Sequence, residues 1–317
     1  MSSLIVTPTI KKQLASRSSS LSIKAFVNNE RPEVLVFTSP SDVGVIRNGG
    51  KLGAGFGPKV IINELKKFQH HSHSLNAVKV IEVTNKKIER EDFTESQTKQ
   101  SIKLKKEIKA AQSCPIIHLG GGHDHIFPLL KSLLELGKKI NIINLDAHLD
   151  TRVEQAPHSG TPFRQFDAIA GKDTFKLHQI GIHQETNAIE NFQSLRNGAM
   201  VVHEEDLASL SDSRIEKILS QIIEQKPDWI NVLSIDLDGL DSSEFQSCSA
   251  INPKGFNFDQ LNKIIQCYES KIDHSGIYGM YEYNPLFDNL ANKDGKKIAW
   301  SINQILKRTG KSKKAQR

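Results

Sequence analysis

Short runs of apolar residues alternate along the chain with longer segments in which apolar residues recur every three or four positions. The short runs are typical of buried strands, and the longer spacing is typical of helices that cover a sheet. A strand followed by a helix, repeated along a chain, indicates βαβ units and a parallel sheet. The strands expected from this pattern are residues 33–37, 78–83, 116–119, 140–145, 177–182, 200–202 and 230–235.

Helices are expected at residues 58–68, 97–112, 127–136, 212–225, 257–269 and 296–307. The lysine-rich part of the second helix is expected to be a solvated outer face. The chain has 317 residues, which is long for one domain but normal for an undivided α/β sheet, and no Pro- or Ser-rich linker interrupts it. We therefore expect one catalytic domain over residues 31–307, preceded by a flexible segment at 1–30 and followed by a basic tail at 308–317.

The net charge of +6 is modest, and part of it lies in the basic tail. No aromatic platform or nucleic-acid motif accompanies that tail, so no nucleic-acid partner is expected. No apolar run is long enough to span a membrane, although residues 1–29, which contain no acidic side chain, are faintly like a transit peptide. The three cysteines have no CxxC or metal spacing, which favours a reducing compartment, and we expect a cytoplasmic protein.

Polar residues with metal-binding chemistry follow the strand expected at 140–145. Asp146, His148 and Asp150 alternate with apolar residues directly after it. In an extended segment residues two apart point to the same side, so the carboxylates and the imidazole project together from the end of the strand. This arrangement indicates a cation site.

A second group of carboxylates, Asp236 and Asp238, follows the strand expected at 230–235. Carboxylates that are brought near one point raise one another's pKa unless metal charge neutralises them. Together with Asp146 and Asp150, this group carries four negative charges, and two divalent cations carry four positive charges. The charges therefore match a site for two cations.

A third strand, expected at 116–119, is followed by three glycines and His123. Glycines let the backbone turn sharply, which leaves the imidazole at a strand end beside the same crevice. Histidines and aspartates form an oxygen-rich ligand set that suits manganese better than it suits a thiolate-type zinc site. Each motif alone could be a capping device or a turn, but three motifs after three apolar strands favour a metal site.

Three segments together resemble the metal-binding motifs of the ureohydrolase family, which includes arginases, agmatinases and formimidoylglutamases. They are residues 120–124 (GGGHD), 146–150 (DAHLD) and 234–241 (SIDLDGLD), in the order and spacing of that family. The resemblance covers roughly residues 33 to 305. It implies an arginase-like α/β fold with three layers, α/β/α, around a mainly parallel sheet.

The resemblance also implies two Mn2+ ions with a bridging hydroxide, and a homo-oligomer. A hydroxide held between two cations exists at neutral pH because metals depress the pKa of water. It would attack a trigonal C=N carbon and release an amine, so the expected reaction is the hydrolysis of a linear amidine, a small-molecule substrate. Asp146, with Asp150 or Asp236, would be shared between the metals. The ligands that the family implies are His123, Asp146, His148, Asp150, Asp236 and Asp238.

Flanking motifs resemble the formimidoylglutamase branch of the family. Residues 158–165 (HSGTPFRQ) are similar to the SGTPF segment of that branch, whereas arginases and agmatinases have a histidine where this chain has Ser159. The triple glycine before His123 and the aspartate after it also resemble this branch. A further similarity in the glycine-rich residues 42–58 is equally consistent with turns and a helix start.

Glu282 matches the family's glutamate after the last strand of the sheet, which the resemblance places beside the amidine nitrogens. A carboxylate there would pair with a cationic amidinium through charge-assisted hydrogen bonds. N-formimidoylglutamate is a dicarboxylate, so its pocket is expected to offer fixed positive charge. The candidate substrate-binding residues, each in or next to a motif, are Arg47, Arg152, Ser159 and Arg164.

The expected function is therefore hydrolysis of N-formimidoyl-L-glutamate to L-glutamate and formamide, a late step of histidine degradation. One alternative is a guanidine-cleaving ureohydrolase of the arginase, agmatinase or guanidinobutyrase type. Another is a non-catalytic metal-binding homologue, although unused buried carboxylates are costly to keep without metal. A zinc-dependent deacylase on the related deacetylase fold would normally use fewer ligands for one metal.

Overall fold

The computed structural model describes residues 32–68, 78–84, 89, 92–111, 114–171, 173–193, 199–207, 209–272 and 276–315. The segment expected to be flexible, residues 1–30, lies outside this part of the chain. Within the described residues, no helix is long and apolar enough to cross a membrane.

A parallel sheet forms the middle of the molecule. Its strands are β1 (Val34–Ser39), β2 (Val78–Glu82), β3 (Ile116–Gly120), β4 (Lys139–Leu145), β5 (Phe175–Ile182), β6 (Val201–His203), β7 (Trp229–Asp236) and β8 (Ile277–Tyr281). They lie in the order β2-β1-β3-β8-β7-β4-β5-β6 and every neighbouring pair is parallel. Each expected strand is present, and β8 adds one that the apolar pattern alone did not indicate.

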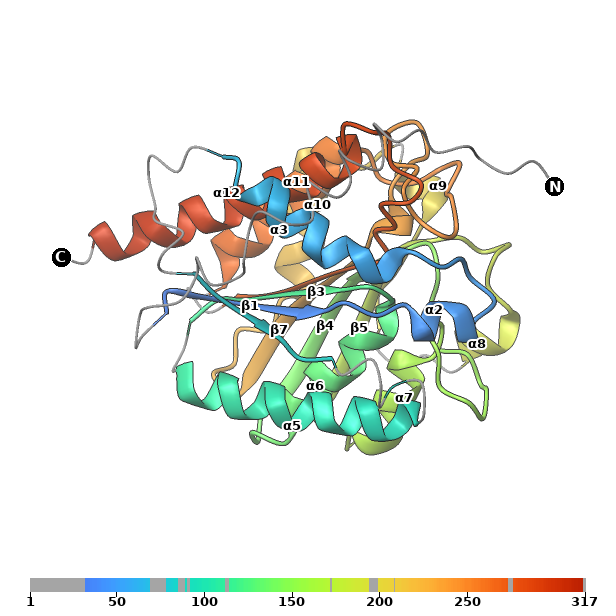
Figure 1. The fold of residues 1–317 in the computed structure, drawn as a ribbon, viewed down its shortest axis with the longest axis horizontal. Helices are drawn as coiled ribbons and strands as arrows, with labels where there is room; N and C mark the ends of the chain where they lie inside the picture. Colours follow the sequence, from blue (N-terminus) through green and yellow to red (C-terminus); the bar gives the residue numbers. More distant parts are fainter. Residues whose placement is uncertain are drawn as a thin grey trace, which may run out of the picture.

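Helices cover both faces of this sheet (Figure 1). On one face α3 (Gly57–Leu65) packs against α12 (Lys293–Ala315), and α10 (Asp212–Ile222) packs against α11 (Phe258–Lys271). On the other face α6 (Ile126–Leu134) contacts both α5 (Phe93–Ala111) and α7 (Pro162–Ile169). The expected three-layer α/β/α architecture is therefore confirmed. The short helices are α2 (Val43–Arg47), η2 (Ala54–Phe56), η4 (His123–His125), α8 (Ile189–Gln193), α9 (Glu204–Leu207) and η5 (Leu237–Gly239).

Burial on both faces explains why the strands are almost continuously apolar. Along β4, Ile143 and Leu145 belong to the hydrophobic cluster that includes residues of α3, α10, α11 and α12. Ile140 and Ile142 belong to the cluster on the opposite face, which includes residues of α6 and α7. A strand in the middle of such a sheet exposes neither side to water, so polar residues within it need a specific reason.

The helix α12 is longer than the sequence pattern indicates. It continues beyond residue 307, where the expected helix ends, to Ala315, and so its backbone includes much of the segment expected to be a basic tail. Lysine and arginine are good helix formers, and lysines near a helix C-terminus interact favourably with its dipole. The basic composition of this segment is therefore compatible with a helix.

The four central strands position the functional residues. β3, β8, β7 and β4 are neighbours, and because they are parallel their carboxyl ends meet at one edge of the sheet. β3 and β4 follow one another in sequence but are separated in space by β8 and β7. Ligand sites of open α/β sheets form at strand ends where connections leave in different directions.

Candidate metal centre

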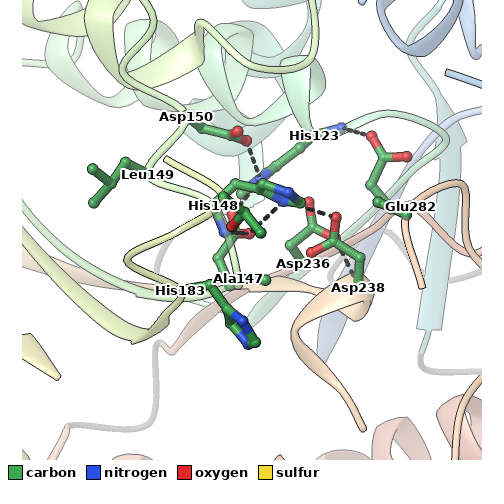
Figure 2. A network of polar contacts seen from close by, with 12 residues as sticks. His123, Ala147, His148, Leu149, Asp150, His183, Asp236, Asp238 and Glu282 are labelled. Atoms are coloured by element: carbon green, nitrogen blue, oxygen red, sulfur yellow. Dashed lines mark hydrogen bonds and ion pairs between the residues drawn. The ribbon is translucent and has the colours of Figure 1, made fainter. Parts of the chain in front are cut away.

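The structure brings the predicted metal ligands together at the carboxyl ends of three of these strands (Figure 2). His123 opens η4 after β3, the segment from Asp146 to Asp150 follows β4, and Asp236 ends β7. Asp238 lies in η5, immediately after β7. Glu282, the candidate catalytic residue, follows β8, the remaining one of the four central strands. It faces the same cluster in Figure 2.

The first group of ligands surrounds the buried imidazole of His123. Its Nδ1 lies 2.8 Å from Asp150 Oδ2, 3.1 Å from Asp236 Oδ2 and 3.2 Å from Asp146 Oδ2. Burial opposes a charge on this ring, but the surrounding carboxylates raise the pKa of His123 well above its usual value. Burial in turn raises the pKa of Asp236 well above its usual range. This dense set of acidic oxygens therefore requires positive charge among them.

The second group consists of His148, Asp146 and Asp238. His148 Nδ1 lies 3.1 Å from Asp238 Oδ2 and 3.6 Å from Asp146 Oδ1. The charge of Asp238 is the main reason that the pKa of His148 is raised well above its usual value, against the effect of burial. Asp146 directs one carboxylate oxygen to each imidazole, so it belongs to both groups. It is the residue best placed to bridge two cations.

The ligand atoms fit divalent cations. Each group offers one atom per residue within 4.8 Å of the others, which is the spacing of ligands around one ion. Asp238 Oδ1 is buried without a hydrogen-bond partner, and His123 Nδ1, although close to three carboxylate oxygens, makes no hydrogen bond of acceptable geometry with any of them. Buried polar atoms are almost always partnered, so these two atoms are explained by a bound cation. Imidazole nitrogens and carboxylate oxygens are ligands that Mn2+ accepts.

The backbone is in the left-handed region at two site residues. Asp150 has a φ of 51° and Glu282 has a φ of 67°. Non-glycine residues adopt this conformation rarely, and it costs about 1–3 kcal/mol. The surroundings hold Glu282 in place, because its backbone N–H donates to Gly121 O and its Oε1 accepts from the backbone N–H of His123 at 3.0 Å. The hydrogen bond from His123 fixes the direction of its carboxylate.

The turn between β3 and η4 requires glycine. A Cβ at Gly121 would lie 1.9 Å from the carbonyl oxygen of Ser41, and a Cβ at Gly120 would lie 2.5 Å from the ring of Tyr281. No side chain fits at such distances. The glycines therefore let the end of β3 pass close to the loop after β1, which places His123 beside the aspartates.

Some residues that the sequence reasoning missed orient these ligands. Ser234 Oγ lies 2.8 Å from His123 Nε2, which leaves Nδ1 to face the carboxylates. Asn144 donates to Asp146 Oδ2 at 3.1 Å. Both Ser234 and Asn144 precede an aspartate ligand by two positions, and they therefore lie on the same face of their strands. A polar residue at that spacing inside an apolar strand is the signal that could have found them.

A cavity of about 270 Å³ adjoins the ligands. At its rim, Arg152 Nη1 donates to Asn48 Oδ1 at 2.7 Å, and Asn48 Nδ2 donates to Ser159 Oγ at 3.1 Å. Lys51 also lines the cavity, and its ammonium lies 5.2 Å from the centre of the Phe287 ring. The same cavity is lined by His148, Asp150, Asp236, Asp238 and Glu282. It therefore combines an acidic part with two cationic residues, of which Arg152 is held by its hydrogen bond to Asn48.

The other two predicted substrate-binding arginines do not line this cavity. Arg47 is exposed, donates through Nε to the carbonyl of Pro157 at 2.8 Å and lies 4.9 Å from the centre of the Phe93 ring. Arg164 is exposed on α7. A place next to a motif does not determine the direction of a long side chain.

A second hollow, of about 480 Å³, lies at the opposite ends of the strands near Trp229.

Comparisons with known proteins agree with this geometry. The model of the arginase family matches residues 32–304. A formimidoylglutamase from Klebsiella pneumoniae (strain 342) is 30% identical over 293 residues, which are 87% of this chain and 87% of that protein. The formimidoylglutamase from Chromobacterium violaceum is 27% identical over 296 residues, which are 90% of this chain and 92% of that protein.

Solved structures give the same result for the fold. The crystal structure of formimidoylglutamase from Bacillus subtilis superposes with a TM-score of 0.78 at 18% identity, covering 96% of this chain and 99% of the other. The structure of Trypanosoma cruzi formiminoglutamase with Mn2+ superposes with a TM-score of 0.72 at 19% identity, covering 93% and 98%. Since the family model spans most of the sequence and the fold agrees, this protein belongs to the arginase family.

Proposed function

We propose that this protein is a binuclear manganese hydrolase that converts N-formimidoyl-L-glutamate and water to L-glutamate and formamide. The observation that carries the proposal is the cavity in which both metal-ligand groups meet Arg152 and Lys51. The names of the relatives support the same substrate, since curated proteins with 27–30% identity are formimidoylglutamases.

The proposed metal ligands divide between the two groups. One ion would be held by the group around His123 and the other by the group around His148, with Asp146 shared. When bound, two Mn2+ ions depress the pKa of water between them and so supply hydroxide at neutral pH. The complete proposed set is His123, Asp146, His148, Asp150, Asp236 and Asp238.

Glu282 is proposed to hold the amidine. It lines the cavity and is fixed by its bond to the backbone of His123. Its carboxylate can accept hydrogen bonds from the amidine N–H groups and so orient the trigonal carbon. Burial raises the pKa of Glu282 well above its usual range, and the charge of Asp238 adds to this effect. This environment favours a carboxylate that shares a proton with substrate nitrogens.

The reaction moves both protons of the water to nitrogen. Water adds its oxygen to the formimidoyl carbon, which becomes tetrahedral, and one of its protons goes to the imino nitrogen. The bond from that carbon to the nitrogen of glutamate then breaks as the C=O bond of formamide forms, and the leaving nitrogen takes up the second proton of the water. Glu282, in contact with the amidine nitrogens, is the residue placed to pass that proton.

The two carboxylates of the substrate are proposed to bind the cationic side chains of the cavity. Arg152 is held by Asn48, which in turn donates to Ser159, so its guanidinium is positioned before substrate arrives. An arginine held in this way can bind a carboxylate through two parallel hydrogen bonds. Lys51 offers a second positive charge for the other carboxylate.

A substrate comparison tests this proposal. The manganese-loaded protein is incubated in parallel with N-formimidoylglutamate, arginine, agmatine and guanidinobutyrate, and release of formamide or urea is measured. We expect formamide and glutamate from the first compound alone. Urea from a guanidine would show a guanidine-cleaving enzyme, and no product from any of the four would favour a non-catalytic homologue.

Arg152→Gln provides the matching test of substrate recognition. Loss of a carboxylate partner should raise the KM for N-formimidoylglutamate by about 10-fold or more with a smaller change in kcat, because the contact is made in the ground state and the transition state alike. Arg164→Gln, on the exposed face of α7, is the control. Equal effects of the two substitutions would contradict the assignment.

The location and the assembly are proposed on separate grounds. No disulfide bond joins the three cysteines, which supports a reducing compartment such as the cytoplasm. Large apolar side chains, among them Leu52 and Leu286 near the cavity, are exposed, which supports a homo-oligomer. Light scattering during size-exclusion chromatography tests the second point, and a monomer at micromolar concentration would contradict it.

A further inference from the structure

Another group of buried acidic and imidazole side chains lies next to the metal centre but shares none of its ligands. Glu89, Asp124 and His125 each offer an atom within 4.8 Å of the others. Asp124 and His125 belong to η4 and are fully buried, and Glu89 is 1% exposed. The mechanism proposed above uses none of the three.

The carboxylates of this group have almost no hydrogen-bond donors. Both oxygens of Asp124 are buried without a hydrogen-bond partner, and the buried oxygens of Glu89 are near no side-chain donor other than the hydroxyl of Ser41. Among the described residues, no lysine or arginine forms an ion pair with either carboxylate. Buried carboxylates in folded proteins are normally paired or bound to metal.

His125 shows where a cation would lie. Its Nδ1 is 3.0 Å from Gln100 Oε1 and 3.7 Å from Asp124 Oδ2, and its Nε2 is 3.2 Å from the carbonyl oxygen of Ser41 and 4.0 Å from Glu89 Oε1. If the ring carries its proton on Nδ1, bonded to Gln100, then Nε2 directs a lone pair towards two oxygens. Ligands held at about 2.1 Å from one octahedral ion are roughly 3–4 Å apart, which matches these separations.

We propose that Glu89, Asp124 and His125, with the carbonyl oxygen of Ser41, bind a third divalent cation. Two carboxylates balance its charge, and the mostly oxygen donor set suits Mn2+, Mg2+ or Ca2+. The ion would tie η4 to Glu89 and to the loop after β1. It would therefore help to hold His123, the first residue of η4, in its position. The proposal does not depend on which amidine is the substrate.

A count of bound metal tests this site. Wild type, Glu89→Gln and Glu205→Gln are brought to equilibrium by dialysis against Mn2+, Mg2+, Ca2+ or Zn2+ in turn, and metal per chain is measured by mass spectrometry. Glu205 is exposed on α9, so its substitution is the matched control. We expect about three equivalents in wild type and in Glu205→Gln with at least one of these cations, and about two in Glu89→Gln.

Two results would overturn the proposal. One is a wild-type content of about two equivalents with every cation, which would mean that His125 itself supplies the positive charge as an imidazolium. The other is a third equivalent that Glu89→Gln retains. Anomalous scattering from manganese-soaked crystals of the wild type provides a check that needs no variant, because a peak between Glu89, Asp124 and His125 is expected. The amidine assay reports on the proposed function separately.

Discussion

Asp146 is the aspartate that lies close to both imidazoles of the metal centre. Its two carboxylate oxygens face different imidazoles, and it is fully buried. The alternation of acidic and apolar residues after β4 was enough to predict that Asp146, His148 and Asp150 share one side. The alternation could not show which aspartate would lie between the two ligand groups, because the position of the second group depends on the neighbouring strand β7.

Alanine substitutions are expected to separate the shared ligand from an unshared one. Asp146→Ala removes an oxygen from both groups, so we expect loss of both ions of the binuclear centre and of turnover. Asp238→Ala affects the group around His148 alone, so about one of these two ions should remain while turnover is still lost. Metal analysis of the dialysed variants measures this difference. Equal retention of metal in the two variants would contradict the role of Asp146 as a bridge.

Ser234→Ala is expected to weaken metal binding although Ser234 is not a proposed ligand. Its hydroxyl is the partner of His123 Nε2, and groups that orient a ligating histidine typically contribute about 10–100-fold in metal affinity or activity. Titration of the metal-free protein with Mn2+ measures the change. Ser301→Ala is a suitable control, because Ser301 is also buried and its hydroxyl donates a hydrogen bond to Asn262, which is not part of the metal centre. No difference between the two variants would argue against an orienting role.

Metal affinity is expected to rise with pH. His123 and His148 are surrounded by carboxylates, which raise the pKa values of both imidazoles well above the usual value for histidine. Both rings therefore hold a proton at neutral pH in the metal-free protein. A cation must displace these protons, and lowering the pH therefore weakens binding. Calorimetry in buffers of different ionisation enthalpy should show proton release with each ion. Affinity independent of pH between 6 and 8 would contradict this expectation.

At the scale of secondary-structure elements, the strands were easier to predict than the turns between them. Apolar runs such as β4 and β7 are visible because both faces of the sheet are covered. The turn from β3 into η4 shows in the sequence only as glycines. The contact of that turn with Ser41, and the approach of Glu89 to η4, join segments that no local pattern connects. For the same reason the direction of Arg47 could not be predicted from its position in a motif.

Gly121→Ala is expected to disturb the element that carries His123. The added Cβ would lie 1.9 Å from the carbonyl oxygen of Ser41, so the backbone of β3 or of the loop must move. Overpacking of this kind costs about 1–3 kcal/mol of stability, and metal affinity should fall with it. Gly171→Ala, where a Cβ would meet only ordinary contacts of 3.5 Å and more, is the control in chemical denaturation. A stability loss no larger than that of the control would contradict this account of the turn.

At the scale of the whole molecule, the fold concentrates acidic side chains at one edge of the sheet. This concentration is unfavourable until positive charge is present, and so metal binding and folding stability are linked. The three-layer architecture follows from the alternation of apolar strands and amphipathic helices. The order of the strands does not follow from that alternation, because it is set by contacts between residues that are distant in sequence.

Chelation of metal is expected to lower the melting temperature. A ligand that binds only the folded state stabilises it by about 2.7 kcal/mol when its free concentration is 100 times its Kd. Thermal unfolding with excess Mn2+ and with EDTA measures the difference. The Asp146→Ala variant should show a clearly smaller response to Mn2+ than wild type, and a response equal to that of wild type would place the stabilising ion elsewhere.

The interleaved strand order has a consequence for synthesis of the chain. β3 and β4 emerge early from the ribosome, but the places between them in the sheet are filled by β8 and β7, which emerge last among the strands. A nascent chain that ends before β8 therefore cannot close the sheet beneath His123. Premature termination or proteolytic loss of the last strand would leave a fragment with neither a complete sheet nor a complete site. Bound metal is accordingly a marker of chains in which β8 has been made and has joined the sheet.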